Sequence, residues 1–186
     1  MESSNKPLMF APSARELVAD ADLAHGAHVL DVATGTGVVA RAAAEAIGST
    51  GHVTALDVSD TMLAIARSQP VSSGAAPIEY IQSAVEDAAL ASGTFHAAFC
   101  QQALQFFDEP ARALARIRKA LRPEGRLHVA LWGSEEEHSL TVAMQRALNA
   151  MESRLKTSGD EAEKTMRSLQ ALSARGRHRT TLLSPF

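Results

Sequence analysis

The sequence predicts an α/β sandwich built on a mostly parallel sheet, and three observations support that prediction. Short apolar runs rich in β-branched residues alternate with Ala- and Leu-rich segments of helical spacing, as in βαβ units. Gly, Pro, Ser and Asp residues stand at the boundaries between them. The chain has 186 residues, which is enough for one domain with a sizeable core and too few for two ordinary domains.

Each predicted strand is a short apolar run bounded by turn residues. The five strands comprise residues 28–33, 52–57, 78–82, 95–101 and 126–132. Capping residues and the spacing of apolar side chains predict helices at 12–23, 38–47, 60–69 and 108–121. Helices that connect successive strands imply a parallel sheet, and the helix at 12–23 is expected to cover one face of it.

The pattern changes after Trp132. A helix is expected at 136–151, a more polar segment begins at Asp160, and no convincing strand follows. The interpretation is a core at 1–135 and C-terminal helices with a tail at 136–186, all within one domain.

The charge balance disfavours polyanionic partners. Lys and Arg total 18 and Asp and Glu total 21, so the formal net charge is −3, which gives no footprint for nucleic acid or an anionic membrane. No apolar run approaches the length of a membrane span, and a cytoplasmic protein is expected. Cys100 is the single cysteine, which excludes an internal disulfide and a multi-cysteine metal site; no metal is expected.

The strongest functional signal is the segment 29–37, VLDVATGTG, where an apolar strand turns through two glycines into a helix. Gly35 and Gly37 have no Cβ, so a ligand can lie against the backbone and meet free N–H groups at the helix start. Asp57 follows Gly37 by twenty positions, at the end of the second strand, where a carboxylate can accept both hydroxyls of a ribose. The expected site lies across the ends of the first, second and fourth strands, where the strand order reverses.

The glycine turn by itself is compatible with more than one ligand. Residues 35–40 also fit the weak dinucleotide pattern G-x-G-x-x-A, and an ordinary tight turn is the simplest alternative. Asp31 favours a ligand with an ammonium group over a dinucleotide, because an anionic side chain before the loop attracts an ammonium group and repels a pyrophosphate. S-adenosylmethionine has an α-amino group, a ribose and no phosphate.

At this point the sequence resembles the class I S-adenosylmethionine-dependent methyltransferases, in the branch of the ubiquinone and menaquinone biosynthesis enzymes and natural-product methyltransferases. The first motif is VLDVATGTG, the second is TALDVSDTMLAIAR at 54–67, the third is QSAVEDAAL at 82–90, and the segment 95–132 matches the fourth and fifth. The resemblance implies an α/β fold and S-adenosylmethionine as cofactor. It places cofactor contacts at Asp31, Ala33, Thr34, Gly35, Gly37, Asp57, Val58, Met62, Ala84, Val85, Glu86 and Cys100.

The sequence departs from the family pattern at several places. Ala84 occupies the position where the family commonly has an acidic residue that binds the adenine amino group, and Glu86 and Asp87 are neighbouring substitutes. The family continues past the fifth strand into a helix and a β-hairpin, and nothing after Trp132 indicates that hairpin, so we expect a fold without it. Phe10 is the remaining candidate for a residue that closes the site.

The remaining candidates concern the methyl acceptor. Gln101, Gln102 and Gln105 follow the fourth strand at its ligand end; they are candidate substrate contacts, Gln101 and Gln105 foremost, or merely cap the loop. Phe106 and Phe107 are expected in the core. His138 is the histidine placed to act as a general base, against a simpler interpretation as a solvated helix-start residue. Cys100 is expected to be buried and unreactive.

The predicted function is methyl transfer from S-adenosylmethionine to a small molecule such as a secondary metabolite or a quinone-like compound. The alternatives are a catalytically silent S-adenosylmethionine-binding or partner protein and, with less support, an NAD(P)-dependent oxidoreductase. A strand at 126–132 without a hairpin would leave a bare sheet edge. Either the helix at 136–151 folds over this edge, or a homodimer or partner chain packs there through the region after Trp132. The run 180–183 is an alternative cover if it adds as a strand.

Overall fold

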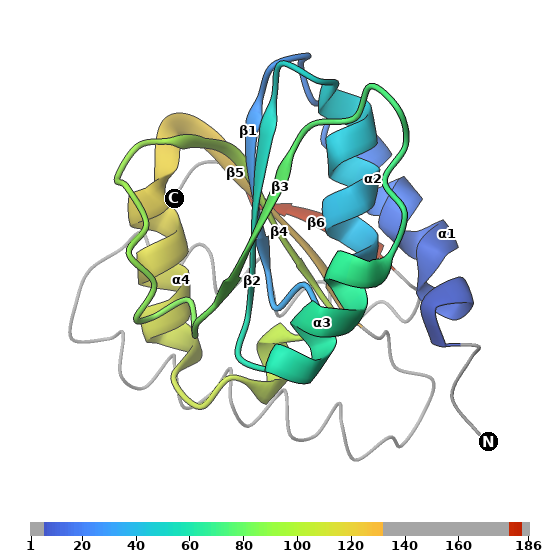
Figure 1. Cartoon of the computed structure of the whole chain (residues 1–186). Helices are drawn as coiled ribbons and strands as arrows, with labels where there is room; N and C mark the ends of the chain where they lie inside the picture. Colours follow the sequence, from blue (N-terminus) through green and yellow to red (C-terminus); the bar gives the residue numbers. More distant parts are fainter. Residues whose placement is uncertain (1–5, 132–178, 184–186) are drawn as a thin grey trace.

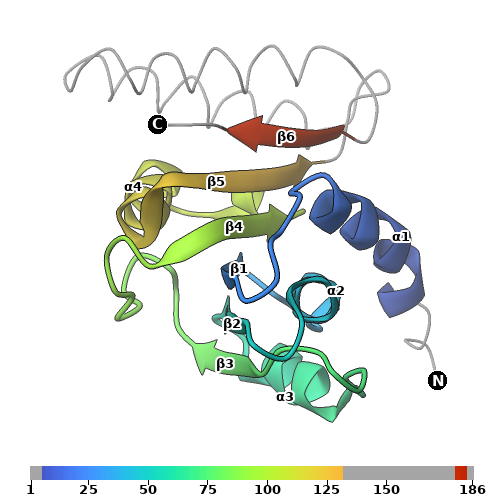
Figure 2. The ribbon, with the colours of Figure 1, turned by 90° about the horizontal axis from the view of Figure 1, so that it is seen from above.

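The computed structural model describes residues 6–131 and 179–183, and these residues form a three-layer α/β sandwich (Figure 1). The sheet has the order β3-β2-β1-β4-β5-β6, which Figure 2 shows from above. The strands are β1 His28–Val32, β2 His52–Asp57, β3 Ile78–Gln82, β4 Phe95–Gln101, β5 Leu121–Leu131 and β6 Arg179–Leu183. The first five are parallel, which confirms the predicted fold class.

The helices cover both faces of the sheet. They are α1 Lys6–Ala19, α2 Val38–Ile47, α3 Asp60–Ser68 and α4 Pro110–Ala120, with a short 3-10 helix, η1, at Leu104–Phe106. Figure 1 shows α4 on one side of the sheet and α1, α2 and α3 on the other. The predicted cover by the N-terminal helix is confirmed, since Ala14 and Leu17 of α1 are fully buried.

Alternate residues of each strand supply two separate cores, as the two-residue period of a strand requires. Leu30 and Val32 pack in the core under α4, whereas Val29 packs in the core under α1 and α2. Strand β1 pairs with β2 on one side and β4 on the other. The strand order therefore reverses at β1, where a crevice forms at the carboxyl ends of the strands.

Two elements, β5 and α1, have boundaries that differ from the predictions by more than two residues. Strand β5 begins at Leu121 instead of residue 126, because Leu121 already pairs with Phe95 before a register shift; pairing resumes at Ala97 and Arg126. Helix α1 begins at Lys6, includes Pro12 and ends at Ala19, so the proline marks neither end of this helix.

The expectation that no convincing strand follows Trp132 was wrong, whereas the alternative that the run 180–183 adds to the sheet as a strand is confirmed. Strand β6 pairs antiparallel with β5, from Leu127 opposite Leu183 to Leu131 opposite Arg179. The described residues thus contain one antiparallel strand where the related fold has a hairpin of two. Because β6 pairs the outer edge of β5 within one chain, the bare edge that suggested a homodimer is absent there. Trp132, the helix expected at 136–151 and His138 lie outside the described residues.

Within the described part of the chain, no helix combines the length and the apolar character that crossing a bilayer requires.

Candidate functional site

A cleft of about 450 Å³ lies at the carboxyl ends of the parallel strands. This volume is within the range of about 300–1,000 Å³ that is usual for small-molecule sites. One wall comes from the ends of β1 and β2, and the opposite wall comes from the segment after β3 and the start of α4. The lining residues are Val32, Ala33, Leu56, Asp57, Val58, Ser83, Ala84, Val85, Glu86, Asp87, Ala103, Phe106, Phe107, Asp108, Glu109 and Arg112.

The two glycines of the first turn have different surroundings. Gly35 has φ +55°, and a Cβ built on it would meet nothing within 4 Å, so its open side is free for a ligand. Gly37 has φ +75°, and a Cβ there would lie 3.0 Å from the Tyr80 hydroxyl and 3.1 Å from Ala66 Cβ. Gly35 therefore suits close approach of a ligand, whereas Gly37 is required by packing at the N-terminus of α2.

The Asp57 carboxylate joins the ends of β1 and β2. Its Oδ2 accepts a hydrogen bond from the Gly35 N–H at 2.7 Å, and its Oδ1 accepts one from the Ser59 N–H at 2.9 Å. Asp57 is 9% exposed and lines the cleft. Each carboxylate oxygen can accept a further hydrogen bond, so Asp57 is able to fix the glycine turn and bind ligand hydroxyls at the same time.

Asp31 is a buried carboxyl at the carboxyl end of β1. The Asp31 Oδ2 atom accepts a hydrogen bond from the Thr34 hydroxyl at 2.6 Å, and Asp31 is 1% exposed. Burial raises the pKa of Asp31 to about 7, against the lowering effect of the Thr34 hydrogen bond. A carboxyl that titrates near neutrality beside a cleft is a frequent mark of a functional site.

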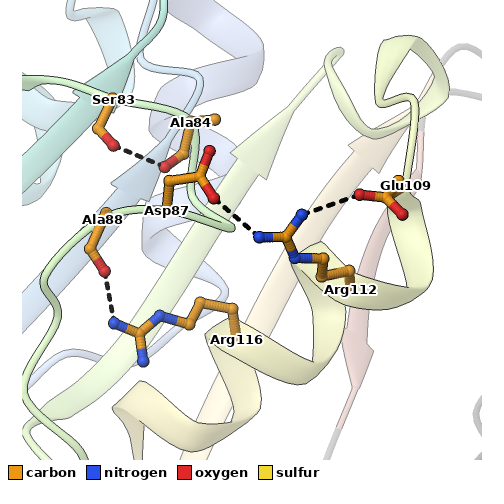
Figure 3. Close-up of polar contacts among 7 residues, drawn as sticks. All are labelled: Ser83, Ala84, Asp87, Ala88, Glu109, Arg112 and Arg116. Carbon is orange, nitrogen blue, oxygen red and sulfur yellow. Dashed lines mark hydrogen bonds and ion pairs between the residues drawn. The ribbon is translucent and has the colours of Figure 1, made fainter.

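The second wall is held to α4 by arginine side chains (Figure 3). The Arg112 guanidinium forms ion pairs with Asp87 Oδ1 at 2.8 Å and Glu109 Oε2 at 2.9 Å. One helical turn later, Arg116 donates hydrogen bonds to the carbonyl oxygens of Ala88 and Leu90. These contacts join residues 25 to 28 positions apart in the sequence, so the segment after β3 depends on α4 for its position.

The charge of the cleft favours a cationic ligand. Its lining carries five carboxylates, at Asp57, Glu86, Asp87, Asp108 and Glu109, against one basic side chain, Arg112. An acidic cleft of this kind raises the local concentration of cations and repels phosphates.

The structure brings half of the predicted cofactor residues to the cleft surface. Those that line it are Ala33, Asp57, Val58, Ala84, Val85 and Glu86. Thr34 and Gly35 lie in the turn that follows β1, and Asp31 lies in β1 and accepts the hydrogen bond of the Thr34 hydroxyl. Gly37 packs against Tyr80, Met62 lies on the exposed surface of α3, and Cys100 is buried in the core under α4.

The Cys100 thiol is fully buried, and burial raises its pKa to about 12. It stays protonated at neutral pH, as the sequence predicts for an unreactive cysteine.

The predicted substrate residues have mixed placements. Gln101 donates a hydrogen bond from Nε2 to the Ser13 hydroxyl at 2.8 Å, which ties β4 to α1. Gln105 Nε2 donates to the Gln102 carbonyl oxygen at 3.0 Å. Phe10 lies within α1, but its side chain is outside the described set, as is the general-base candidate His138.

The prediction that Phe106 and Phe107 belong to the core was wrong for Phe106. Both line the cleft, and Phe106 is 68% exposed, while Phe107 also packs against the core. Sequence reasoning also did not place Arg112 at the cleft. Its position on the first turn of α4, beside Glu109, was visible in the sequence, but its partner Asp87 is brought close only by the fold.

Comparisons with known proteins agree with this geometry. A family model described as a methyltransferase domain matches residues 29–125. The chain is 37% identical over 98 residues to a ubiquinone/menaquinone biosynthesis C-methyltransferase of Methylobacterium nodulans, covering 53% of this chain and 39% of that protein. It is 29% identical over 118 residues to the nocamycin O-methyltransferase of Saccharothrix syringae, covering 63% and 42%.

A solved S-adenosylmethionine-dependent methyltransferase from Aquifex aeolicus has a similar fold, with a TM-score of 0.63, 24% identity and coverage of 73% of this chain and 72% of that one. The described residues therefore share the fold of that methyltransferase. The chain belongs to the methyltransferase-domain family. It spans about 40% of the length of these two curated relatives.

Proposed function

We propose that the protein binds S-adenosylmethionine in the cleft and transfers its methyl group to a small-molecule acceptor, such as a secondary metabolite or a quinone-like compound. The observation that carries the proposal is the arrangement of three groups at the carboxyl ends of β1 and β2: the open face of Gly35, the Asp57 carboxylate bonded to it at 2.7 Å, and the buried Asp31. An adjacent acidic cleft of about 450 Å³ provides the space.

Each part of this wall fits one part of the cofactor. Asp57 suits the ribose hydroxyls, because its oxygens retain acceptor capacity beyond the Gly35 and Ser59 bonds. Asp31 suits the α-ammonium group, because a cation favours the ionised form of a carboxyl. Val58 and the segment around Ala84 and Val85 line the cleft where a nucleobase would pack.

When bound, S-adenosylmethionine supplies an electrophilic methyl group. Transfer of this methyl group would leave S-adenosylhomocysteine, and an acceptor hydroxyl would release its proton to solvent. The protein contributes by holding donor and acceptor in line and by excluding water. The described residues do this with the rigid turn at Gly35 and the aromatic wall at Phe106 and Phe107.

A catalytically silent binding protein is the second candidate, and Ala84 is the observation in its favour. The resemblance places an acidic residue at this position, and here the wall has a methyl side chain with the Ser83 hydroxyl bonded to the Ala84 carbonyl oxygen at 2.8 Å. A weaker adenine contact is compatible with binding without turnover. The cytoplasmic location predicted from the sequence remains part of the proposal.

Calorimetric titration with S-adenosylhomocysteine and with NADH tests the proposal. Binding of S-adenosylhomocysteine alone is the expected result, and binding of NADH alone would replace the proposal with the oxidoreductase alternative. Incubation with radiolabelled methyl donor and a set of phenol, amine and quinol acceptors separates the two candidates, because a silent protein binds the cofactor and labels no acceptor.

A further inference from the structure

The second wall of the cleft contains a turn that lies outside any helix or strand. Residues Ser83 to Asp87 follow the end of β3 and line the cleft. The Asp87 and Ala88 N–H groups both donate to the Ala84 carbonyl oxygen, at 3.2 and 3.0 Å. These hydrogen bonds determine the internal shape of the turn, but they do not fix its position relative to the rest of the fold.

The turn is attached to the fold in a different way on each side. On the β3 side, the Ser83 N–H donates to the Asp57 carbonyl oxygen at 3.0 Å, which joins the turn to the first wall. On the other side, α4 provides the attachment. The Arg116 guanidinium donates to the carbonyl oxygens of Ala88 and Leu90, which are residues only 3% and 8% exposed. Figure 3 shows the bond to Ala88.

Arg112 also reaches this turn from α4, but it bonds to a different kind of group. Its partner there is the Asp87 carboxylate, and both side chains are more than half exposed. An exposed ion pair is weak, and a carboxylate on a rotatable side chain leaves the backbone behind it free to shift. The partners of Arg116 are backbone carbonyl oxygens, and hydrogen bonds from a charged donor are among the stronger ones. Arg116 is therefore the arginine that fixes the backbone of the turn.

The position fixed by Arg116 is transmitted to the cleft. Ala88, Leu90 and Val85 pack together in the core under α4, and Val85 also lines the cleft. Ala88 is in addition hydrogen-bonded to the carbonyl oxygen of Ala84, which is a lining residue. A shift of the backbone at Ala88 would therefore displace the two residues that line this part of the wall.

We propose that Arg116 is a positioning residue for the base of the cofactor, and that it acts through the turn without touching the ligand. The proposal rests on the proposed function, in which the segment around Ala84 and Val85 packs against the nucleobase. The ribose and the ammonium group of the ligand would meet Asp57 and Asp31 instead, at the carboxyl ends of β1 and β2. Loss of the Arg116 hydrogen bonds should therefore weaken binding of the base and leave binding of the rest of the ligand unchanged.

Two ligands separate these contributions: S-adenosylhomocysteine, and S-ribosylhomocysteine, which has the ribose and the amino acid but no base. In ligand-observed NMR titrations of the full chain, Arg116→Met should weaken binding of S-adenosylhomocysteine about three- to tenfold, because buried side chains keep part of the turn's position when the hydrogen bonds are lost. The same variant should change binding of S-ribosylhomocysteine by less than about twofold, as for independent sites. An equal loss for both ligands, or no loss for either, would overturn the proposal.

Two further variants control this comparison. Arg116→Lys keeps the charge and a donor, so it should recover most of the affinity for S-adenosylhomocysteine. Lys119→Met is the matched control, because it removes one positive charge from an exposed position in the last turn of the same helix. It should bind both ligands as the wild type does. A loss in Lys119→Met equal to that in Arg116→Met would show that charge alone is responsible, which would contradict the positioning role.

Hydrogen exchange of the ligand-free chain tests the same role without a cofactor. Arg116→Met should speed exchange of the Asp87 and Ala88 amides by roughly three- to tenfold, because the turn opens more often. The Gly35 and Ser59 amides, which donate to Asp57, should exchange as in the wild type. Faster exchange throughout the sheet would show a general structural role and overturn the proposal. Failure of the wild-type chain to bind S-adenosylhomocysteine would reject the proposed function separately, since the exchange pattern still shows whether Arg116 fixes the turn.

Discussion

The two walls of the cleft are constructed in different ways. In the first wall, Asp57 is 9% exposed and bonds directly to backbone N–H groups of the glycine turn and of α3. In the second wall, Arg112 joins Asp87 and Glu109 through side chains that are each more than half exposed. Buried hydrogen bonds to a charged group are stronger than exposed ion pairs. The first wall is therefore suited to binding a part of the ligand that does not vary. Substitutions in the second wall should change the free energy of unfolding only slightly.

The largest expected effect lies in the first wall. Gly35→Val should abolish binding of S-adenosylhomocysteine in calorimetry, because the side chain would occupy the open space beside the turn. Gly74→Val is the matched control: Gly74 also has a positive φ, +84°, and nothing within 4 Å of a Cβ, and it lies between α3 and the amino end of β3 instead of in the turn after β1. If both variants lose binding equally, the loss in Gly35→Val is caused by backbone strain and not by the side chain filling the open space.

Asp57→Ala should weaken the same binding by roughly 1.5–3 kcal/mol, the range for hydrogen bonds to a charged group. It should also lower the free energy of unfolding without ligand, because the Gly35 and Ser59 N–H groups lose their acceptor. Calorimetry measures the change in affinity, and urea unfolding measures the change in the free energy of unfolding. Unchanged affinity in this variant would remove Asp57 from the cofactor site.

The affinity for S-adenosylhomocysteine should fall about tenfold between pH 8 and pH 6. A ligand ammonium favours ionised Asp31, so below the Asp31 pKa of about 7 binding must release a proton. Stability without ligand has the opposite dependence. The raised pKa contributes stability that is complete below about pH 4, the unfolded value, and is lost as the pH rises through about 7. Asp31→Asn should flatten both profiles, and an unchanged affinity profile in that variant would exclude the ammonium contact.

In the second wall, Ala84→Asp should tighten binding of S-adenosylhomocysteine by about 1 kcal/mol through a restored hydrogen bond to the adenine amino group. Competition with S-inosylhomocysteine, which lacks that amino group, is the check, because the gain should be confined to the adenosyl compound. Weaker binding of the adenosyl compound would show that Glu86 or another group already holds the adenine.

The smallest expected effect is that of Arg112→Met, at most about 1 kcal/mol in affinity or stability, because the ion pairs with Asp87 and Glu109 are exposed. The effect should shrink further in high salt. Arg116→Met provides the comparison, since its bonds to the Ala88 and Leu90 carbonyl oxygens are partly buried. A larger loss of affinity in Arg112→Met than in Asp57→Ala would show that the second wall contributes more to binding than the first.

The sequence was informative where neighbouring residues determine the geometry. The strand β1, the glycine turn and helix α2 are contiguous, so the alternation of apolar residues and the two glycines located them together. Asp57 could be added because it ends the next strand. The second wall was not predictable in this way, since Arg112 reaches Asp87 across 25 positions. The aromatic Phe106 has the apolar character of a core residue, and only the exposed turn after β4 places it on the cleft.

Strand β6 illustrates the same limit. Its sequence, RTTLL, is short and only partly apolar, and its pairing with β5 joins residues some 50 positions apart, from Leu131 opposite Arg179 to Leu127 opposite Leu183. The alternative that the run 180–183 covers this edge came from the need to pair residues 126–132, because the local pattern of RTTLL does not by itself indicate a strand.

A crystal structure of the protein with S-adenosylhomocysteine bound tests the central claim most directly. We expect ribose hydroxyl oxygens within hydrogen-bond distance of Asp57, the ammonium group on the side of Asp31, and the ligand lying against Gly35 with the adenine between Val58 and Ala84. We also expect residues 33–37 to have the same backbone conformation with and without the ligand. A ligand bound elsewhere, or a glycine turn rearranged on binding while the segment 83–90 stays fixed, would contradict the central claim.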